Sequence, residues 1–195
     1  MNVILAFPGQ GSQYVGMGKN QKDVENIYLK ANQVLGFDLH QMILEGPSQE
    51  LKKTAHTQPA IVAYSLALFY RLKKILDTKK HSISMVLGHS VGEYSALAAA
   101  EVLSFEDVIK SVHLRGKFMQ EAAQGGTMFA ILKEPQELIE WACEQASQGQ
   151  EIVSIANYNE PMQTVISGHL PACLKAIEIL TDHNKKRVKA LELQV

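Results

Sequence analysis

The chain places one serine between two glycines, where a predicted strand meets a predicted helix. Residues 86–100 read VLGHSVGEYSALAAA. The short apolar run Ile83–Leu87 predicts a buried strand, and the alanine-rich segment after the serine predicts a helix. Gly88 and Gly92 flank Ser90 at two positions on either side. This GxSxG pattern on a strand–turn–helix holds a serine hydroxyl at the carboxyl end of a sheet, and the glycines permit the close approach.

Two interpretations of Ser90 follow from this setting. In the first, Ser90 is a nucleophile, and the N-terminus of the helix stabilises the anion that develops beside it. In the second, its hydroxyl only caps the helix. A chance GxSxG match is expected in roughly 5% of chains of this length, so it is the strand–turn–helix context that favours the nucleophile.

Alternating strands and helices in the first two thirds of the chain indicate the α/β class. Such alternation is typical of a parallel sheet covered on both faces. The predicted elements are a strand over Asn2–Phe7, a helix over Val24–Val34 closed by Gly36, a helix from Pro59 to about Leu76, the strand Ile83–Leu87, a helix that ends near Leu103, and a further helix capped by Ser104.

The predicted order changes after Gly125 and Gly126. The elements that follow are the strand Thr127–Leu132, the helix Pro135–Ser147, the strands Ile152–Asn157 and Thr164–Ser167, the helix Pro171–Asp182 and the strand Arg187–Leu193. This βαββαβ order is the ferredoxin-like one. We therefore expect two domains, residues 1–125 in an α/β layer and residues 126–195 in a compact ferredoxin-like unit.

Composition excludes several function classes. Nineteen basic and twenty acidic residues give a net charge of −1, so no long-range field favours nucleic acid or an anionic membrane. The N-terminus, MNVILAFPGQ, lacks the basic region of a signal peptide, and the stretch Ala60–Leu72 is too short to span a bilayer. Cys143 and Cys173 form no CxxC pair, so both are expected to be small buried residues in a protein of the cytoplasm. No histidine spacing predicts a metal site.

A glycine-rich loop, FPGQGSQYVGMGKN, follows the first predicted strand. A dinucleotide-binding GxGxxG motif would need glycine where Tyr14 stands. A Walker loop has the pattern GxxxxGK followed by serine or threonine, but Gly16 is followed by Met17, and Lys19 is followed by Asn20. Both phosphate-binding motifs therefore fail. The loop lies at the same predicted sheet edge as Ser90, where its backbone N–H groups can supply half of an oxyanion hole.

Arg115 lies on the apolar stripe of its predicted helix. Val108, Val112, Arg115 and Met119 are spaced four, three and four residues apart. A guanidinium there needs an anionic partner or a route to water. Two interpretations stay open on this evidence, namely a structural ion pair or snorkelling to the surface, and a fork that binds a substrate carboxylate.

Other polar residues near these motifs carry weaker signals. His89 adjoins Ser90, but neighbouring residues on a sharp turn seldom face one another, so we interpret His89 as orienting the turn and not as a general base. Asn157 and Asn159 follow a predicted strand, where asparagine is common as a turn residue. The remaining histidines are scattered and are interpreted as solvated or core-edge residues.

Six motifs in this chain together resemble the malonyl-CoA:acyl-carrier-protein transacylase family and its polyketide-synthase acyltransferase relatives. They stand in family order and are spread over almost the whole chain. They are FPGQGSQ (7–13), TQPA (57–60), GHSVGEYSAL (88–97), HLRGKFMQ (113–120), GTMFAIL (126–132) and NYNEPMQTVISG (157–168).

The resemblance implies roles for individual residues. Ser90 would be the acylated nucleophile, and the backbone N–H groups of Gln10 and Val91 would bind the oxyanion. Arg115 would bind the malonyl carboxylate. The implied reaction moves a malonyl group from malonyl-CoA to the phosphopantetheine thiol of acyl carrier protein, by a ping-pong acyl-serine mechanism that needs no cofactor or metal.

The resemblance also implies that Asn157 and His89 line the cleft, and that an α/β-hydrolase-like large subdomain carries the ferredoxin-like unit as an insertion. The family's catalytic histidine is expected in an SxPxH segment, which residues 1–195 do not contain. The large subdomain is thus expected to be incomplete here. Alternatives are a trans-acting polyketide synthase malonyltransferase, an α/β-hydrolase esterase, which would leave FPGQGSQ unexplained, and a non-catalytic remnant that binds carrier protein.

Overall fold

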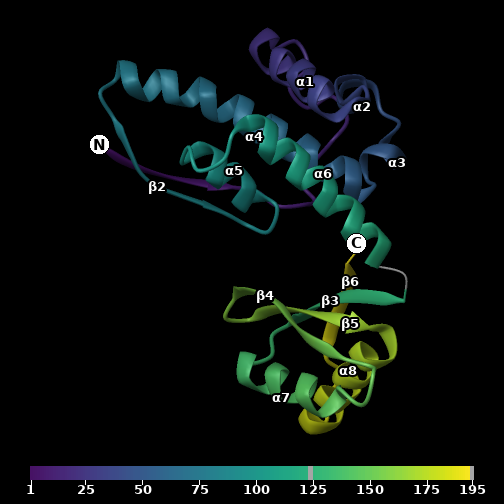
Figure 1. Cartoon of the computed structure of the whole chain (residues 1–195). Helices are drawn as coiled ribbons and strands as arrows, with labels where there is room; N and C mark the ends of the chain where they lie inside the picture. Colours follow the sequence, from purple (N-terminus) through teal and green to yellow (C-terminus); the bar gives the residue numbers. More distant parts are fainter. Residues whose placement is uncertain (123–124, 194–195) are drawn as a thin grey trace. The chain divides into compact units, whose positions relative to one another are not determined.

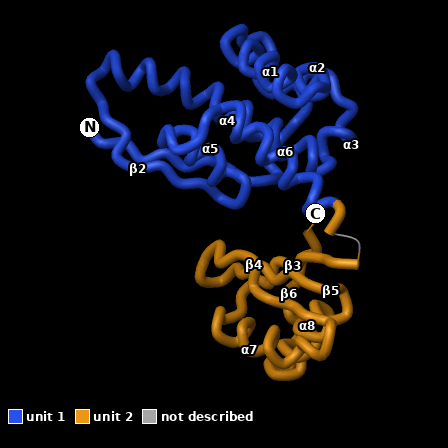
Figure 2. The backbone as a smooth tube through the Cα atoms, viewed as in Figure 1, with its two compact units in different colours: residues 1–120 blue, residues 121–195 orange. Residues whose placement is uncertain are grey.

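The computed structural model describes residues 1–122 and 125–193. The chain divides into two compact units, Met1–Gln120 and Glu121–Val195, which Figure 2 shows in two colours. Unit 1 denotes the first of these below, and unit 2 the second. Among the described residues, no helix is long and apolar enough to cross a membrane.

Unit 1 combines a parallel strand pair with helices (Figure 1). Its elements are β1 (Asn2–Phe7), α1 (Lys22–Leu35), α2 (Leu39–Glu45), α3 (Ser48–Leu51), α4 (Thr54–Thr78), β2 (Ser82–Gly88), α5 (Gly92–Ala99) and α6 (Phe105–Ala122), which runs on past the unit boundary. β1 pairs with β2 in parallel, from Asn2 opposite Ser82 to Phe7 opposite Gly88. The predicted parallel pairing and the α/β class are therefore confirmed, whereas α2 and α3 were not predicted.

Helix α4 forms the centre of unit 1. Most of its residues from Thr54 to Phe69 are buried, as expected for a helix enclosed by other elements. Tyr28 of α1 is fully buried in the same core, and its hydroxyl donates to the Met17 carbonyl at 3.0 Å. Burial raises the pKa of Tyr28 well above its usual range. The hydroxyl thus stays a neutral donor that holds the end of the glycine-rich loop.

The predicted start of a helix at Pro59 is wrong, because α4 begins at Thr54 and Pro59 lies inside it. Proline has no N–H and so leaves the carbonyl four residues earlier without its helical partner. That carbonyl, of Ala55, instead lies 3.0 Å from Nδ1 of His113. A contact from α6 thus compensates for the missing hydrogen bond.

The helix after Ser90 is shorter than predicted, since α5 ends at Ala99 and not near Leu103. Glu101 takes a left-handed φ of 61°, and the Val102 N–H donates to the Leu97 carbonyl at 3.0 Å. These bonds terminate the helix as a left-handed C-terminal motif does.

The predicted end of α1 and the predicted cap of α6 are both confirmed. Gly36 closes α1 with a φ of 75°, which is the left-handed conformation that glycine adopts most readily. The Asp107 N–H donates to Ser104 Oγ at 3.1 Å, and the Ser104 hydroxyl donates to the Asp107 carboxylate at 2.7 Å. Ser104 therefore supplies an acceptor to the first turn of α6.

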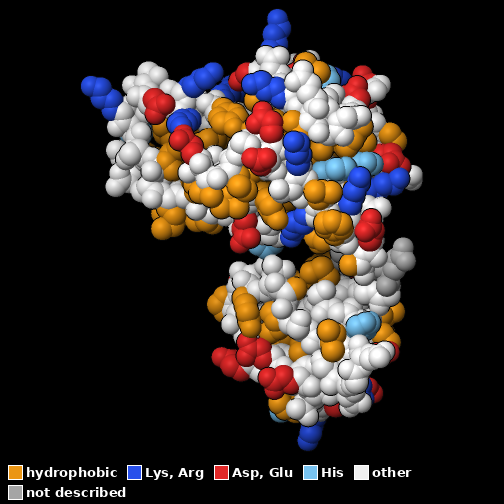
Figure 3. Space-filling model, viewed as in Figure 1, with side chains coloured by type: hydrophobic (Ala, Val, Ile, Leu, Met, Phe, Trp, Pro, Cys, Tyr) orange, Lys and Arg blue, Asp and Glu red, His pale blue; other side chains and the backbone are white. Residues whose placement is uncertain are grey.

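The strand pair of unit 1 is only partly covered. Ile4 is 60% exposed, Met85 56% and Leu87 46%, and hydrophobic side chains gather at the surface of this region in Figure 3. Parallel sheets are ordinarily covered on both faces. The predicted covering of both faces is therefore absent among the described residues.

Unit 2 follows the predicted βαββαβ order. Its elements are β3 (Gly126–Leu132), α7 (Gln136–Ala146), β4 (Val153–Glu160), β5 (Gln163–His169), α8 (Leu170–Asn184) and β6 (Lys189–Leu193). The strands lie in the order β4-β5-β3-β6, with antiparallel neighbours throughout. This is the ferredoxin-like strand order expected from the sequence.

One hydrophobic cluster lies between the sheet of unit 2 and its two helices. Phe129, Ile131 and Ile166 of the sheet belong to it, together with Cys143 of α7 and Cys173 of α8. Both cysteines are buried free thiols, as predicted. Burial raises the pKa of Cys143 to about 12, so the thiol remains protonated and behaves as a small apolar group.

Candidate active site

Ser90 lies on a sharp turn between the end of β2 and the start of α5. Its φ is +52°, a left-handed conformation that few residues other than glycine adopt. The turn is closed by the Gly92 N–H, which donates to the His89 carbonyl at 2.9 Å, and by the Glu93 N–H, which donates to the Ser90 carbonyl at 3.1 Å. Strain of this kind persists only where the surroundings determine the backbone, and it concentrates at functional sites.

The glycines around Ser90 permit contacts that no side chain would allow. A Cβ on Gly88 would lie 2.0 Å from the Gly92 carbonyl carbon, and one on Gly92 would lie 2.4 Å from the Phe7 carbonyl oxygen. A Cβ on Gly9 would lie 2.6 Å from Nδ1 of His89. The Gly88 contact is the close approach of strand and helix that the GxSxG pattern predicted. The Gly9 and Gly92 contacts in addition pack the loop after β1 directly on the turn that carries Ser90.

The interpretation of Ser90 as a helix cap is wrong. Helix α5 begins without any side-chain cap hydrogen bond. The Ser90 hydroxyl instead accepts a hydrogen bond from Nη2 of Arg115 at 3.3 Å. A guanidinium thus lies beside the strained serine, on a helix that starts fifteen residues after it.

Arg115 reaches Ser90 from the half-buried edge of α6. Val108 and Val112, on the same helical stripe, are fully buried. Among the described residues Arg115 forms no ion pair with a carboxylate. A guanidinium has five N–H donors. One contact to Ser90 leaves the geometry for a carboxylate fork intact.

Two backbone N–H groups, one in the loop after β1 and one directly after Ser90, are without acceptors in the described part of the chain. The loop after β1 is held by Ser12 Oγ, which donates to the Gly9 carbonyl at 3.0 Å, and by the Gly11 N–H, which donates to Gln13 Oε1 at 2.8 Å. The intervening Gln10 N–H and the Val91 N–H have no partner among the described residues, although Val91 is only 1% exposed. Gln10 is an exposed residue, whereas an unpaired N–H at a buried residue such as Val91 is rare and suits an oxyanion.

His89 contributes to the turn through its backbone. Its N–H donates to the Phe7 carbonyl at 3.0 Å, which extends the β1–β2 pairing by one residue. Its imidazole lies on the exposed side of the turn, next to Gly9. The residue is thus part of the contact between the two loops, in keeping with an orienting role.

Asn157 belongs to unit 2 and lies inside β4, so the interpretation of Asn157 and Asn159 as turn residues is wrong. Ile155 is opposite Ile166, but after a register shift Asn157 is opposite Val165. This irregularity is a β-bulge, which moves a residue to the other face of a sheet. Asn157 therefore shares the sheet face that points away from α7 and α8.

Gly116 is a further residue that the sequence did not mark. Its Cβ would lie 2.6 Å from the Thr54 carbonyl oxygen and 2.7 Å from Ala55 Cα, so α6 touches the backbone of α4 one residue after Arg115. The only signal for it in the sequence is its place next to Arg115. Among the described residues no group of three or more His, Cys, Asp or Glu side chains is placed to hold a metal ion.

The sequence model of the acyl transferase domain matches residues 4–195. The chain belongs to the acyl transferase domain family. The match covers both units, and it therefore includes the Ser90 turn, Arg115 and the βαββαβ unit.

Curated relatives of this acyl transferase domain include two bacterial malonyl CoA-acyl carrier protein transacylases. The protein of Haemophilus influenzae is 42% identical over 197 residues, which cover 98% of this chain and 62% of the relative. The protein of Escherichia coli K12 is 43% identical with the same coverage. The chain thus spans less than two thirds of the length of these relatives.

Solved structures show the same fold. An acyl carrier protein S-malonyltransferase from Vibrio cholerae aligns with a TM-score of 0.86 at 38% identity, covering 98% of this chain and 63% of that one. A malonyl-transacylase in complex with a type II PKS acyl-carrier protein aligns with a TM-score of 0.86 at 40% identity, covering 98% and 62%. The α/β fold of this acyl transferase domain is therefore that of known malonyltransferases.

Proposed function

We propose that this acyl transferase domain takes part in moving a malonyl group from malonyl-CoA to the phosphopantetheine thiol of acyl carrier protein, in fatty acid biosynthesis. The observation that carries the proposal is the Arg115 guanidinium 3.3 Å from Ser90 Oγ. In a malonyl thioester one methylene separates the carboxylate from the reacting carbonyl. A carboxylate fork beside the nucleophile therefore matches the two ends of this small acyl group.

The reaction proceeds in two transfers through an acyl-serine. Ser90 Oγ attacks the thioester carbonyl, its proton passes to a base, and the C–S bond breaks to release CoA as the thiol. The thiol of the carrier protein then attacks the malonyl-serine ester, and the Oγ–C bond breaks as Ser90 regains its proton. In both transfers the carbonyl oxygen becomes an oxyanion, for which the N–H groups of Gln10 and Val91 are the donors.

The base is assigned to the histidine that the family resemblance implies in an SxPxH segment, which residues 1–195 do not contain. His89 is the neighbour of Ser90, but its backbone holds the turn, so it is assigned an orienting role. General-base assistance contributes about 10²–10⁴-fold. Residues 1–125 then form the N-terminal part of the large subdomain and residues 126–195 the small one, with Asn157 in the cleft.

A second candidate is the same transfer to the carrier protein of a polyketide synthase. The malonyl-transacylase in complex with a type II PKS acyl-carrier protein is 40% identical to this chain, close to the 42% and 43% of the two curated malonyl CoA-acyl carrier protein transacylases. The two candidates share every residue assigned above. Transfer rates to a fatty acid and to a polyketide carrier protein, measured side by side, separate them.

Trapping of the acyl-serine tests the proposal. The complete gene product, incubated briefly with malonyl-CoA, is expected to gain one malonyl group that peptide mapping places on Ser90. Ser90→Ala removes the attacking oxygen and should abolish the label. Ser95→Ala is the matched control, because Ser95 is fully buried on α5 and its hydroxyl has no partner among the described residues. Label on Cys143 or Cys173, or label lost equally in both variants, would contradict the assignment.

A further inference from the structure

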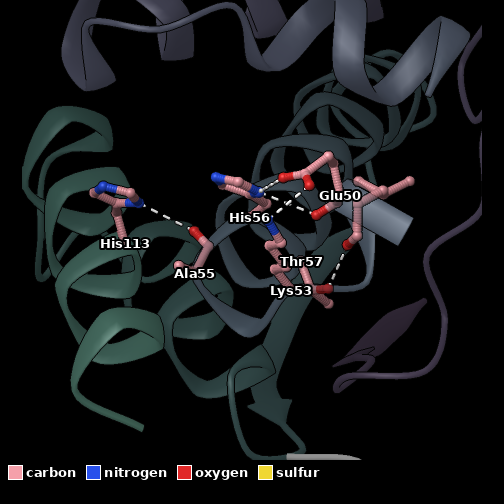
Figure 4. A network of polar contacts seen from close by, with 7 residues as sticks. Glu50, Lys53, Ala55, His56, Thr57 and His113 are labelled. Carbon is pink, nitrogen blue, oxygen red and sulfur yellow. Dashed lines mark hydrogen bonds and ion pairs between the residues drawn. The ribbon is translucent and has the colours of Figure 1, made fainter. Parts of the chain in front are cut away.

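Pro59 creates an unusual acceptor near the start of α4. A residue with an N–H at this position would bond to the Ala55 carbonyl, four residues earlier. Because proline lacks that N–H, the carbonyl is open to another helix. Figure 4 shows His113 of α6 directed at this carbonyl, with 3.0 Å between Nδ1 and the oxygen. Ala55 is only 8% exposed. Without His113, its carbonyl would therefore be a nearly buried acceptor with no hydrogen-bond donor, which is unfavourable.

Gly116 brings α6 onto the same part of α4. Its missing side chain allows contact with the Thr54 carbonyl and Ala55 Cα, where a Cβ would lie at 2.6 and 2.7 Å. Residues three apart lie on one face of a helix, so His113 and Gly116 form a two-point contact with the first turn of α4. Such a contact determines how far α6 is rotated about its own axis.

An aromatic residue holds the His113 ring in place. Phe37, between α1 and α2, has its ring centroid 5.4 Å from that of His113 and 5.4 Å from that of His56. His56 is itself fixed, because its Nδ1 lies 3.0 Å from the Glu50 carbonyl, as Figure 4 shows. The His113 side chain is therefore packed as well as hydrogen-bonded, which limits its rotamers.

Arg115 lies between the two contact residues, so its direction depends on them. A helix is rigid over three residues, and a rotation of α6 moves the Arg115 guanidinium away from Ser90. We infer that His113 is a positioning residue: through its bond to the Ala55 carbonyl it sets the rotation of α6 that brings Arg115 to the nucleophile. The inference rests on the proposed function, since it concerns the binding of the malonyl carboxylate.

The protonation of His113 follows from its acceptor. A carbonyl oxygen only accepts, so Nδ1 must carry a proton in this contact. Both the neutral Nδ1–H tautomer and the imidazolium satisfy that requirement. The positioning role therefore does not depend on the charge of His113, and an amide N–H at the same place can replace it.

Two variants of the complete gene product separate the donor from the ring. His113→Phe keeps the packing on Phe37 but removes the donor, and it should raise KM for malonyl-CoA about three- to tenfold, the range expected for one lost neutral hydrogen bond. Transfer of the acetyl group from acetyl-CoA, which lacks the carboxylate, should change less than about twofold. His113→Asn places an amide N–H near the position of Nδ1 and should restore most of the malonyl KM. His56→Phe, on the same aromatic cluster but without a bond to α6, is the control with no selective effect.

A double variant distinguishes this inference from the proposed function. Arg115→Ala should itself lose malonyl transfer selectively, and adding His113→Phe to it should cause no further loss, because the positioned group is gone. An unselective Arg115→Ala would refute the proposed function. A selective Arg115→Ala with additive loss in the double variant, equal losses of both acyl groups in His113→Phe, or no rescue by His113→Asn would refute the positioning role alone.

Pro59→Ala is a second route to the same contact if His113→Phe does not fold. The new N–H at residue 59 competes with His113 for the Ala55 carbonyl. We expect a selective rise in the malonyl KM, smaller than that of His113→Phe, with no fall in melting temperature. An unchanged malonyl KM in Pro59→Ala would overturn the inference.

Discussion

Units 1 and 2 both pack helices on a sheet, but their strands pair in different directions. In unit 2 every strand pairs antiparallel with its neighbours, and two helices cover one face through a single cluster. In unit 1 two parallel strands pair across a crossover that contains four helices. The only left-handed serine of the described chain and the glycine contacts around it also lie in unit 1.

This difference bears on where the proposed site lies. Five of the six candidate residues lie in unit 1, at the close contact between the β1 loop, the Ser90 turn and α6. They are Gln10, His89, Ser90, Val91 and Arg115. Close backbone approach leaves N–H groups unpaired and a serine strained, which costs stability. The largely buried α4 provides the packing that offsets this cost.

The largest effect is expected from a methyl group at Gly88. Gly88→Ala would put a Cβ 2.0 Å from the Gly92 backbone, where no flexible side chain can yield. We expect a loss of about 3–5 kcal/mol in the free energy of unfolding, measured by denaturant unfolding. The loss should appear in probes of unit 1 and leave those of unit 2 unchanged.

Gly149→Ala in unit 2 is the matched control. Its φ is +58° and a Cβ there would meet nothing within 4 Å, so only the left-handed strain remains, worth about 1–2 kcal/mol. Equal losses in the two variants would break the comparison, because the tight contact in unit 1 would then carry no special cost.

The next largest effect concerns Arg115. Arg115→Ala removes a charge-assisted carboxylate contact and should lower malonyl transfer about ten- to a hundredfold. Asn157→Ala in unit 2 should lower it no more than about tenfold, the upper end of the range for one neutral hydrogen bond. Values of kcat/KM with malonyl-CoA and acetyl-CoA measure both. A larger loss for Asn157→Ala than for Arg115→Ala would move the centre of the site to unit 2.

The smallest effect concerns the start of α6. Ser104→Ala removes the acceptor of the Asp107 N–H and should cost about 1 kcal/mol. Ser104→Thr keeps a hydroxyl and should cost less. Helices α7 and α8 begin without side-chain caps, so only unit 1 is expected to show this sensitivity. A thermal melt in which Ser104→Ala matches the parent chain would show that packing alone holds α6.

Much of unit 2 was predictable because its signals are local. Apolar spacing indicated each strand and helix, although β4 and β5 are the only consecutive strands of unit 2 that also pair in its sheet among the described residues. Its one informative failure is Asn157, where the strand continues to Glu160. Asparagine is a usual turn signal, but the bulge after Ile155 and the pairing with β5 overrode it.

In unit 1 the sequence predicted a helix end correctly where the local backbone demands one residue type. It failed where a contact with a distant part of the chain determines the helix boundary. Ser104 and Gly36 were assigned correctly because a cap and a left-handed C-terminus each demand a residue type. Pro59 was assigned wrongly, because its tolerance inside α4 depends on a bond from His113 that no local pattern shows.

By itself, the amino-acid sequence determined that Ser90 would lie on a strand–turn–helix, because only glycines at positions 88 and 92 permit the backbone to approach so closely. It also determined the class of fold, because short apolar runs typical of strands alternate with apolar residues at helical spacing. Only the tertiary structure shows that the Arg115 guanidinium reaches Ser90 and forms no ion pair with a carboxylate among the described residues. The position of Arg115 depends on how α6 packs on α4, through contacts between residues 58 positions apart in the chain. Helical spacing specifies a face of a helix but not the partner that the face meets.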